Sequence, residues 1–137
     1  EDLGIIPDDV IEFRNRHHLR GMSVLQFGFT GELATNPHHP SNITEQQIAY
    51  TGTHDNNTAV GWFEDATEEE RTNVQSLALP DEAIQDTLIR LAKESNAGIS
   101  IFPLQDFLGL GPDARMNIPG QKGKNWGWKF TWPKLDR

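Results

Sequence analysis

Residues 54–56 form a His-Asp-Asn cluster that follows a short apolar approach, residues 48–49. A strand that ends in such a cluster projects polar side chains from one edge of a sheet, and the active sites of closed α/β barrels lie at the C-terminal ends of their strands. The first residue, Glu1, adds a second carboxylate to that of Asp55. Two opposed carboxylates in a pocket are the minimum equipment for cleaving a bond between two sugars. Glu1 and Asp55 are therefore the candidate catalytic residues.

A structural role is the alternative for both residues. Asp55 and Asn56 can simply satisfy backbone groups in a turn after the strand, and a carboxylate such as Glu1 is most often a solvated surface charge. The small residues at positions 51–53, Thr-Gly-Thr, favour the functional interpretation, because they let a ligand approach the backbone closely.

The composition narrows the classes of partner. The chain has 137 residues, a formal net charge of −8 and no cysteine. An acidic chain is a poor candidate for binding nucleic acid, which requires a basic surface, and it is equally unsuited to an anionic membrane surface. The sequence contains no apolar run that approaches the ~20 residues of a membrane span. Without cysteines there is no disulfide framework and no thiolate zinc site, whereas a neutral, hydroxyl-rich substrate suits this charge.

Local patterns predict helices and strands in alternation. Helices are expected from Pro7 to about His17, from the Thr67–Glu70 capping box to about Leu77, and from Pro80 to Asn96, where apolar residues follow helical spacing. Strands are expected at residues 23–29, 47–52 and 99–104, with a long polar loop over 30–46 and an irregular tail after the last strand.

Apolar strands that alternate with helices indicate a parallel sheet buried on both faces, which is an α/β fold. Three strands cannot close a barrel of eight, and a complete (β/α)8 barrel takes about 250 residues. The chain is thus expected to form an incomplete part of such a barrel, with residues 1–137 as a single segment. Because the sequence begins with Glu1 rather than Met, we expect it to be a piece of a longer protein.

The remaining motifs predict no cofactor and no metal. Residues 109–114 formally fit a dinucleotide-binding fingerprint, but Pro112 and the lack of a following helical pattern argue against it. The histidine pairs at 17–18 and 38–39 are adjacent in sequence, and neighbouring residues do not easily ligate one tetrahedral metal. The tryptophans at 126, 128 and 132 can stack on sugars, but burial in a core or an interface is the preferred expectation.

A set of short motifs occurs in one order along the chain: Glu1-Asp2-Leu3-Gly4, Gly21-Met22, Val24-Leu25-Gln26-Phe27, Tyr50 to Asn56, Gly61-Trp62, Pro103-Leu104-Gln105-Asp106, Ala114-Arg115-Met116-Asn117, Pro119-Gly120 and Asn125-Trp126. This ordered set resembles the C-terminal part of 4-alpha-glucanotransferases, also called amylomaltases or disproportionating enzymes, from Glu1 to about Trp128. The resemblance implies the C-terminal part of an α-amylase-like TIM barrel, about its last three strands and their helices.

The resemblance also implies a reaction and a role for each candidate residue. The reaction is the transfer of α-1,4-glucan segments between maltodextrins with retention, through a covalent intermediate on an Asp nucleophile. Glu1 matches the acid/base, and Asp55 matches a second Asp that stabilises the transition state. His54 matches a neighbour that binds sugar hydroxyls, and Asn117 a contact to the same sugar. Phe27 resembles an aromatic platform on the acceptor side.

The nucleophile of this reaction is expected on an earlier strand, upstream of Glu1. Asp2, Asp8 and Asp9 are no substitutes, because a retaining mechanism needs the nucleophile about 5 Å from the acid/base, across one bond. We therefore expect the isolated chain to be inactive and its partner to be the missing N-terminal part of its own barrel. The alternatives are a non-catalytic glucan-binding piece and a barrel remnant without function. The expected compartment is a bacterial cytoplasm or a plastid.

Overall fold

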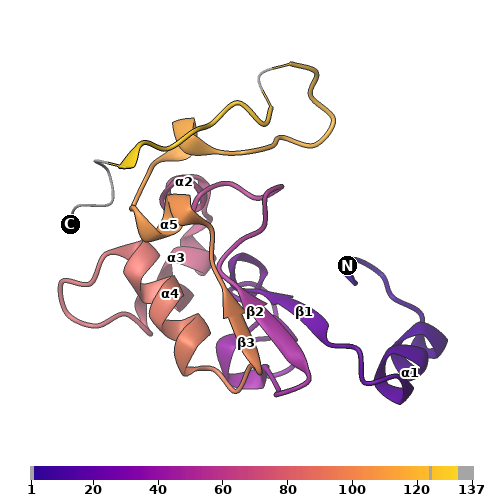
Figure 1. Cartoon of the computed structure of the whole chain (residues 1–137). Coiled ribbons are helices and arrows are strands. Elements are labelled where there is room, and N and C mark those ends of the chain that lie inside the picture. The colour runs from indigo at the N-terminus through magenta and orange to yellow at the C-terminus, as the bar shows by residue number, and fades with distance from the viewer. Residues whose placement is uncertain (1, 124, 133–137) are drawn as a thin grey trace.

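Three short strands form one parallel sheet in the computed structural model, which describes residues 2–123 and 125–132. The strands are β1 (Gly21–Val24), β2 (Gln47–Tyr50) and β3 (Ile99–Ile101), and β2 lies between the other two (Figure 1). Their register places Ser23 opposite Ala49, and Ala49 opposite Ser100. The parallel α/β arrangement predicted from the sequence is confirmed.

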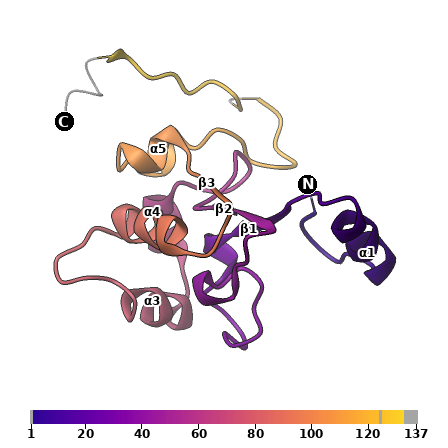
Figure 2. The ribbon, with the colours of Figure 1, turned by 60° about the horizontal axis from the view of Figure 1, so that its bottom comes forward.

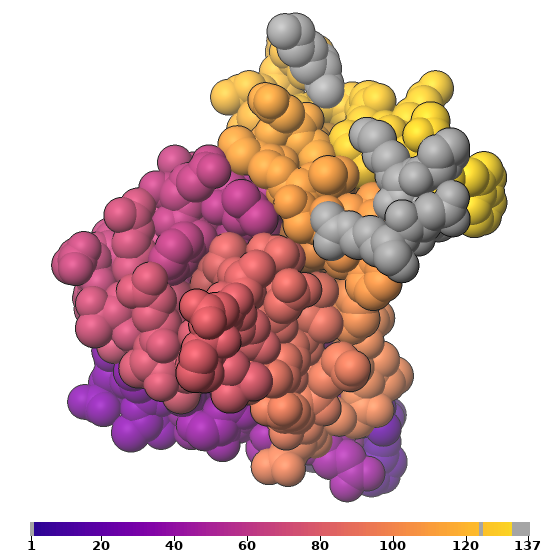
Figure 3. All heavy atoms as spheres, turned by 90° about the vertical axis from the view of Figure 1, so that its left-hand side faces the viewer, coloured from indigo at the N-terminus to yellow at the C-terminus, as the bar shows by residue number. Residues whose placement is uncertain are grey.

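The helices are α1 (Asp8–Arg16), α2 (Ala59–Asp65), α3 (Glu68–Gln75), α4 (Ile84–Glu94) and α5 (Leu104–Phe107). Helices α2 to α5 gather together, whereas α1 lies apart from them, beyond the edge strand β1 (Figures 1 and 2). The segment after α5 runs across the α2 and α5 end of the molecule, and in the space-filling view it rises above the surface of α3 and α4 (Figure 3). Among the described helices, none is both long and apolar enough to cross a membrane.

Helices α3 and α4 follow from local sequence signals. Thr67 and Glu70 form the predicted capping box: the Thr67 hydroxyl accepts from the Glu70 amide, and the Glu70 carboxylate accepts from the Thr67 amide. Helix α4 buries Leu88 and Leu91 on the predicted apolar stripe. Burying one such side chain contributes about 1.5–3 kcal/mol, so this stripe fixes α4 against the core. The core cluster consists of Leu25, Phe29, Ile43, Ala49, Ala59, Val74, Leu88, Leu91 and Ala92.

The predicted strand over residues 23–29 is wrong at both ends. Strand β1 begins at Gly21 and ends at Val24, and residues 25–27 form a 3-10 turn closed by a 2.8 Å bond from the Gly28 amide to the Leu25 carbonyl. The turn is held by a distant partner, because the buried Gln26 side chain donates to the Asn57 carbonyl over 2.9 Å. A contact across 31 residues leaves no signal in the local pattern.

Two other predicted strands are too long, and two helices were not predicted. Strand β2 ends at Tyr50, and β3 ends at Ile101 because Pro103 stands at the start of α5. Helix α5 has only 4 residues, too few to show a helical period. Helix α2 does carry a usable signal: the Thr58 hydroxyl accepts from the Gly61 amide and caps the helix.

Candidate active site

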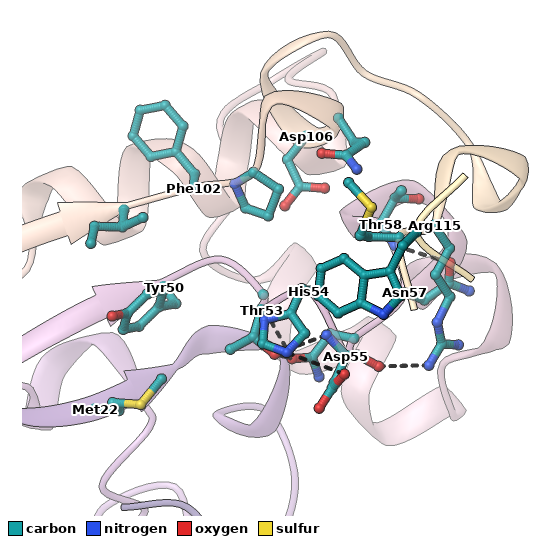
Figure 4. A pocket seen from close by; sticks show the side chains of 17 residues that line it. Met22, Tyr50, Thr53, His54, Asp55, Asn57, Thr58, Phe102, Asp106 and Arg115 are labelled. Carbon is teal, nitrogen blue, oxygen red and sulfur yellow. Dashed lines mark hydrogen bonds and ion pairs between the residues drawn. The ribbon is translucent and has the colours of Figure 1, made fainter. Parts of the chain in front are cut away.

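A pocket of about 430 Å³ lies where β2 and β3 end. Its walls are the 52–58 loop after β2, residues of the β3–α5 segment, and Arg115, Met116 and Trp126 from the segment after α5 (Figure 4). Parallel strands bring residues that are far apart in the chain to one edge of the sheet. The pocket therefore occupies the position at which the sequence predicted the polar cluster.

Asp55 is fixed by two contacts to the segment after α5. Asn117 Nδ2 donates to Asp55 Oδ1 over 2.6 Å, and Arg115 Nη2 donates to the Asp55 backbone carbonyl over 2.7 Å. The side chain of Asp55 is 44 % exposed. The carboxylate is thus held in place and still open to a ligand from the pocket, where Figure 4 shows it beside His54.

The 52–58 loop is shaped by its own side chains. Asn56 Oδ1 accepts from the Thr53 amide at 2.9 Å and from the Thr53 hydroxyl at 2.8 Å. Asn56 therefore has the turn role that was the structural alternative, whereas the Asp55 carboxylate turns toward Asn117. The space beside Gly52 is filled from within the protein, because a Cβ there would lie 2.6 Å from Gln26 Nε2. The glycine lets the Gln26 amide approach the loop.

His54 connects the loop to the segment after α5. Its ring packs against Trp126 in a tilted contact, with centroids 5.1 Å apart and an angle of 38° between the planes, and its carbonyl accepts from the Asn117 amide over 3.1 Å. His54 Nε2 lies 3.4 Å from Asp55 Oδ1. Trp126 is 60 % exposed and lines the pocket. Trp126 and Trp132 are exposed within the described residues, so neither is buried in the core of this chain.

Asp106 lines the pocket but was not predicted from the sequence as a site residue. Its carboxylate is only 1 % exposed, and it accepts from the Thr51 hydroxyl over 2.6 Å and from the Ala59 amide over 2.7 Å. Burial raises the pKa of Asp106 above its ordinary value, and the hydrogen bonds from Thr51 and Ala59 oppose that shift. The available signal was an acidic residue placed just after an apolar strand, at the same sheet edge as Asp55.

The other predicted site residues are placed as follows. Phe27 lies in the turn after β1, 42 % exposed, with its ring edge against His38 at a centroid distance of 5.6 Å. Neither Phe27 nor Asn117 is among the described residues that line the pocket. Glu1 lies outside the described residues. The structure thus brings together His54, Asp55 and Asn117 and leaves Phe27 apart from them. In residues 2–123 and 125–132, no group of three or more acidic, histidine or cysteine side chains is arranged to hold a metal ion.

Residues 1–134 match the family model described as 4-alpha-glucanotransferase. The chain belongs to the 4-alpha-glucanotransferase family. The match spans the pocket and every predicted site residue, and the family is the one that the motifs resembled.

Named 4-alpha-glucanotransferases are similar to this chain over almost its full length. The chloroplastic/amyloplastic protein of Solanum tuberosum is 47 % identical over 95 % of the chain, and the protein of Synechocystis is 45 % identical over 95 %. The solved amylomaltase of Streptococcus agalactiae in complex with acarbose is 34 % identical, with a TM-score of 0.93 over 98 % of the chain. The chain spans only about a quarter of these proteins: 23 %, 26 % and 28 % of their lengths, respectively.

Proposed function

We propose that this chain forms part of the active site of a retaining 4-alpha-glucanotransferase, which transfers α-1,4-glucan segments between maltodextrins. In this proposal the chain is the C-terminal part of a (β/α)8 barrel and contributes its last three strands. The observation that carries the proposal is the hydrogen bond from Asn117 to Asp55 at the strand-end pocket. The likeness to an amylomaltase solved in complex with acarbose supports a glucan as the ligand.

In this mechanism Asp55 stabilises the transition state. As the sugar ring flattens toward an oxocarbenium ion, hydrogen bonds between its hydroxyls and a fixed carboxylate become stronger. Asn117 holds Asp55 Oδ1 at 2.6 Å, so the carboxylate does not have to reorient during the reaction. His54 stands beside Asp55 as a second group for the sugar hydroxyls. Glu1 is the proposed acid/base, which protonates the leaving oxygen and then deprotonates the incoming sugar.

The isolated chain is proposed to be inactive. Among the described residues that line the pocket, the carboxylates are those of Asp55 and Asp106. Asp106 is buried, and each of its oxygens already accepts a hydrogen bond, so it is not free to attack a sugar. A retaining transfer needs a nucleophile about 5 Å from the acid/base, and we assign that nucleophile to an earlier strand of the same barrel.

The proposed partner is therefore the N-terminal part of the same barrel. Within the described residues β1 and β3 are the edges of the sheet, and β3 leaves Ile99 and Ile101 each 45 % exposed. Unpaired strand edges with apolar side chains are surfaces for pairing with further strands. Since similar proteins come from chloroplasts or amyloplasts and from bacteria, we propose a plastid or a bacterial cytoplasm as the compartment.

A glucan-binding piece without catalysis is the second candidate. It is favoured by Trp126, which lines the pocket and is 60 % exposed, because an exposed indole provides an apolar face for a sugar ring. Titration of the isolated chain with maltoheptaose tests this second candidate. Saturable binding at millimolar ligand supports this second function, and no binding removes it.

The decisive test is a chimera of this chain with a relative. Residues 1–134 replace the matching segment of the Synechocystis 4-alpha-glucanotransferase, and glucose release from maltotriose is measured. We expect turnover by the chimera and by the Synechocystis parent, and none by the isolated chain. A chimera that folds but does not release glucose would contradict the proposed function, and turnover by the isolated chain would refute its proposed inactivity.

A further inference from the structure

One buried carboxylate holds both ends of the loop that carries His54 and Asp55. Asp106 Oδ2 accepts from the Thr51 hydroxyl at 2.6 Å, just before the 52–58 loop, and Asp106 Oδ1 accepts from the Ala59 amide at 2.7 Å, just after it. Thr51 and Ala59 are both fully buried, at 0 % exposure. The two oxygens of a carboxylate are a fixed distance apart, so these bonds set the separation of the two loop ends.

The rest of the loop is attached at points between these ends. Gln26 Nε2 donates to the Asn57 carbonyl over 2.9 Å, and Arg115 Nη2 donates to the Asp55 carbonyl over 2.7 Å. These two attachments come from the turn after β1 and from the segment after α5. Asp106 differs from them because, from α5, it bonds the residues at both ends of the loop, on either side of Asp55.

A carboxylate at this place is costly for stability. Burial of a charged group is unfavourable unless hydrogen bonds compensate for the lost water, and Asp106 is 1 % exposed. An apolar residue would fill the same space without that cost but would leave the Thr51 hydroxyl and the Ala59 amide without their acceptor. The buried carboxylate thus fixes the positions of the loop ends, although an apolar residue at this place would cost less stability.

We propose that Asp106 is a positioning residue that sets the distance between the ends of the 52–58 loop and thereby fixes Asp55 against Asn117. This inference rests on the proposed function, since it assigns the purpose of the fixed loop to transition-state stabilisation by Asp55. Asp106 acts through the loop and does not itself touch the sugar.

The alternative is that Asp106 only anchors the start of α2. In that case its removal lowers stability in the same way as any core truncation and leaves the properties of the folded active site unchanged. Val74→Ala is the matched control, because Val74 is fully buried in the same core but lies on α3, outside the residues that line the pocket among those described.

The experiment compares Asp106→Ala, Asp106→Asn and Val74→Ala in the chimera. Three quantities are measured: hydrogen–deuterium exchange of the peptide that covers residues 51–59, kcat for maltotriose, and KM for maltotriose. Asp106→Ala is expected to speed exchange in this peptide and to lower kcat about tenfold to a hundredfold, as for lost hydrogen bonds to a charged group. KM is expected to change less than about threefold, because the lost positioning acts mainly in the transition state.

Asp106→Asn is the rescue variant. Its amide oxygen accepts from the Ala59 amide, and its NH2 group donates to the Thr51 hydroxyl oxygen, so both loop ends keep a partner. We expect this variant to recover most of kcat and to keep the exchange of the 51–59 peptide slow. If Asp106→Ala does not fold, Thr51→Val provides the milder test, since it removes one of the two bonds and is expected to give a smaller change in the same direction.

The outcomes separate this inference from the proposed function. If Asp106→Ala behaves like Val74→Ala, with a lower melting temperature but unchanged exchange at 51–59 and unchanged kcat, the positioning role is overturned. It is also overturned if Asp106→Asn is as damaging as Asp106→Ala. If the unmodified chimera folds but is inactive, the proposed function fails, and the exchange measurement alone then decides whether Asp106 fixes the loop.

Discussion

Asn117 and Asp55 lie 62 residues apart in the sequence, yet Asn117 Nδ2 donates to Asp55 Oδ1 over only 2.6 Å. A second bond, from Arg115 to the Asp55 carbonyl, holds the same two segments together. The segment after α5 is thus the support against which the carboxylate of the 52–58 loop is oriented. Because the loop leaves β2 and the support follows α5, the site exists only once the fold has formed.

Removal of the Asn117 amide is expected to slow the reaction. In the chimera, Asn117→Ala should lower kcat about tenfold to a hundredfold, because a hydrogen bond to a charged group contributes about 1.5–3 kcal/mol. Asn73→Ala is the control, since Asn73 Nδ2 donates to the Phe29 carbonyl over 2.8 Å, outside the described pocket lining. Equal kcat values for the two variants would show that the Asn117 contact does not serve catalysis.

Trp126 is expected to contribute to glucan binding. It packs against His54 and lines the pocket, and a lost aromatic contact of this kind is worth about 0.5–1.5 kcal/mol. Trp126→Ala should weaken maltoheptaose binding by the chimera about threefold to tenfold, as measured by calorimetric titration. Trp132 is 76 % exposed and packs on Phe130, so Trp132→Ala should leave the affinity unchanged. A larger loss for Trp132→Ala would reverse this assignment.

Elements with local signals could be predicted from the sequence. The capping box of Thr67 and Glu70 lies within four consecutive residues and gave the start of α3, and the apolar stripe through Leu88 and Leu91 gave α4. The turn that ends β1 could not be predicted, because it depends on a bond from Gln26 to a carbonyl 31 residues away. Local propensity yields to such tertiary contacts.

The candidate site was predictable only in part for the same reason. Asp55 and His54 were visible as a polar cluster after an apolar strand. Asp106 was not recognised, although it follows β3, because its importance depends on the burial of its carboxylate and on partners 55 and 47 residues away. Burial of Trp126 in a core or an interface was the expectation, and within this chain the segment that carries Trp126 lies over the pocket, with the indole exposed.

Acid is expected to destabilise the chain through Glu82. The hydrogen bond to Arg90 is the main cause that lowers the pKa of Glu82 from 4.5 to about 2. A carboxyl group whose pKa is lower in the folded state contributes its full stability above pH 4.5 and loses it as the pH falls through about 2. Urea denaturation of the chain between these values should show this loss, and Glu82→Gln should remove it.

Glu94 provides the control for this measurement. It also pairs with Arg90, at 3.0 Å, but its side chain is 62 % exposed, compared with 13 % for Glu82. Exposed ion pairs contribute little to stability. Glu94→Gln should therefore keep the pH dependence of the unmodified chain, and an equal effect of both variants would contradict the assignment to Glu82.

The titration of Asp106 is expected to change the stability of the chain with pH in the direction opposite to that of Glu82. Because burial raises its pKa above the ordinary value of 3.8, the folded state holds the proton more tightly than the unfolded state. This contribution to stability is fully present below pH 3.8 and is lost as the pH rises through the folded-state pKa. The melting temperature of Asp106→Asn, relative to the unmodified chain, should therefore rise with pH. A difference that stays constant with pH would contradict this expectation.

The central claim is that Asp55 stabilises the transition state of glucan transfer, and its most direct test is kcat for maltotriose in the chimera with Asp55→Asn. This substitution keeps the size of the side chain and a partner for Asn117 but removes the negative charge. We predict a loss of at least about a hundredfold in kcat, the scale found when a preorganised electrostatic contact is removed, with folding unchanged. A variant that releases glucose at the rate of the unmodified chimera would contradict the claim.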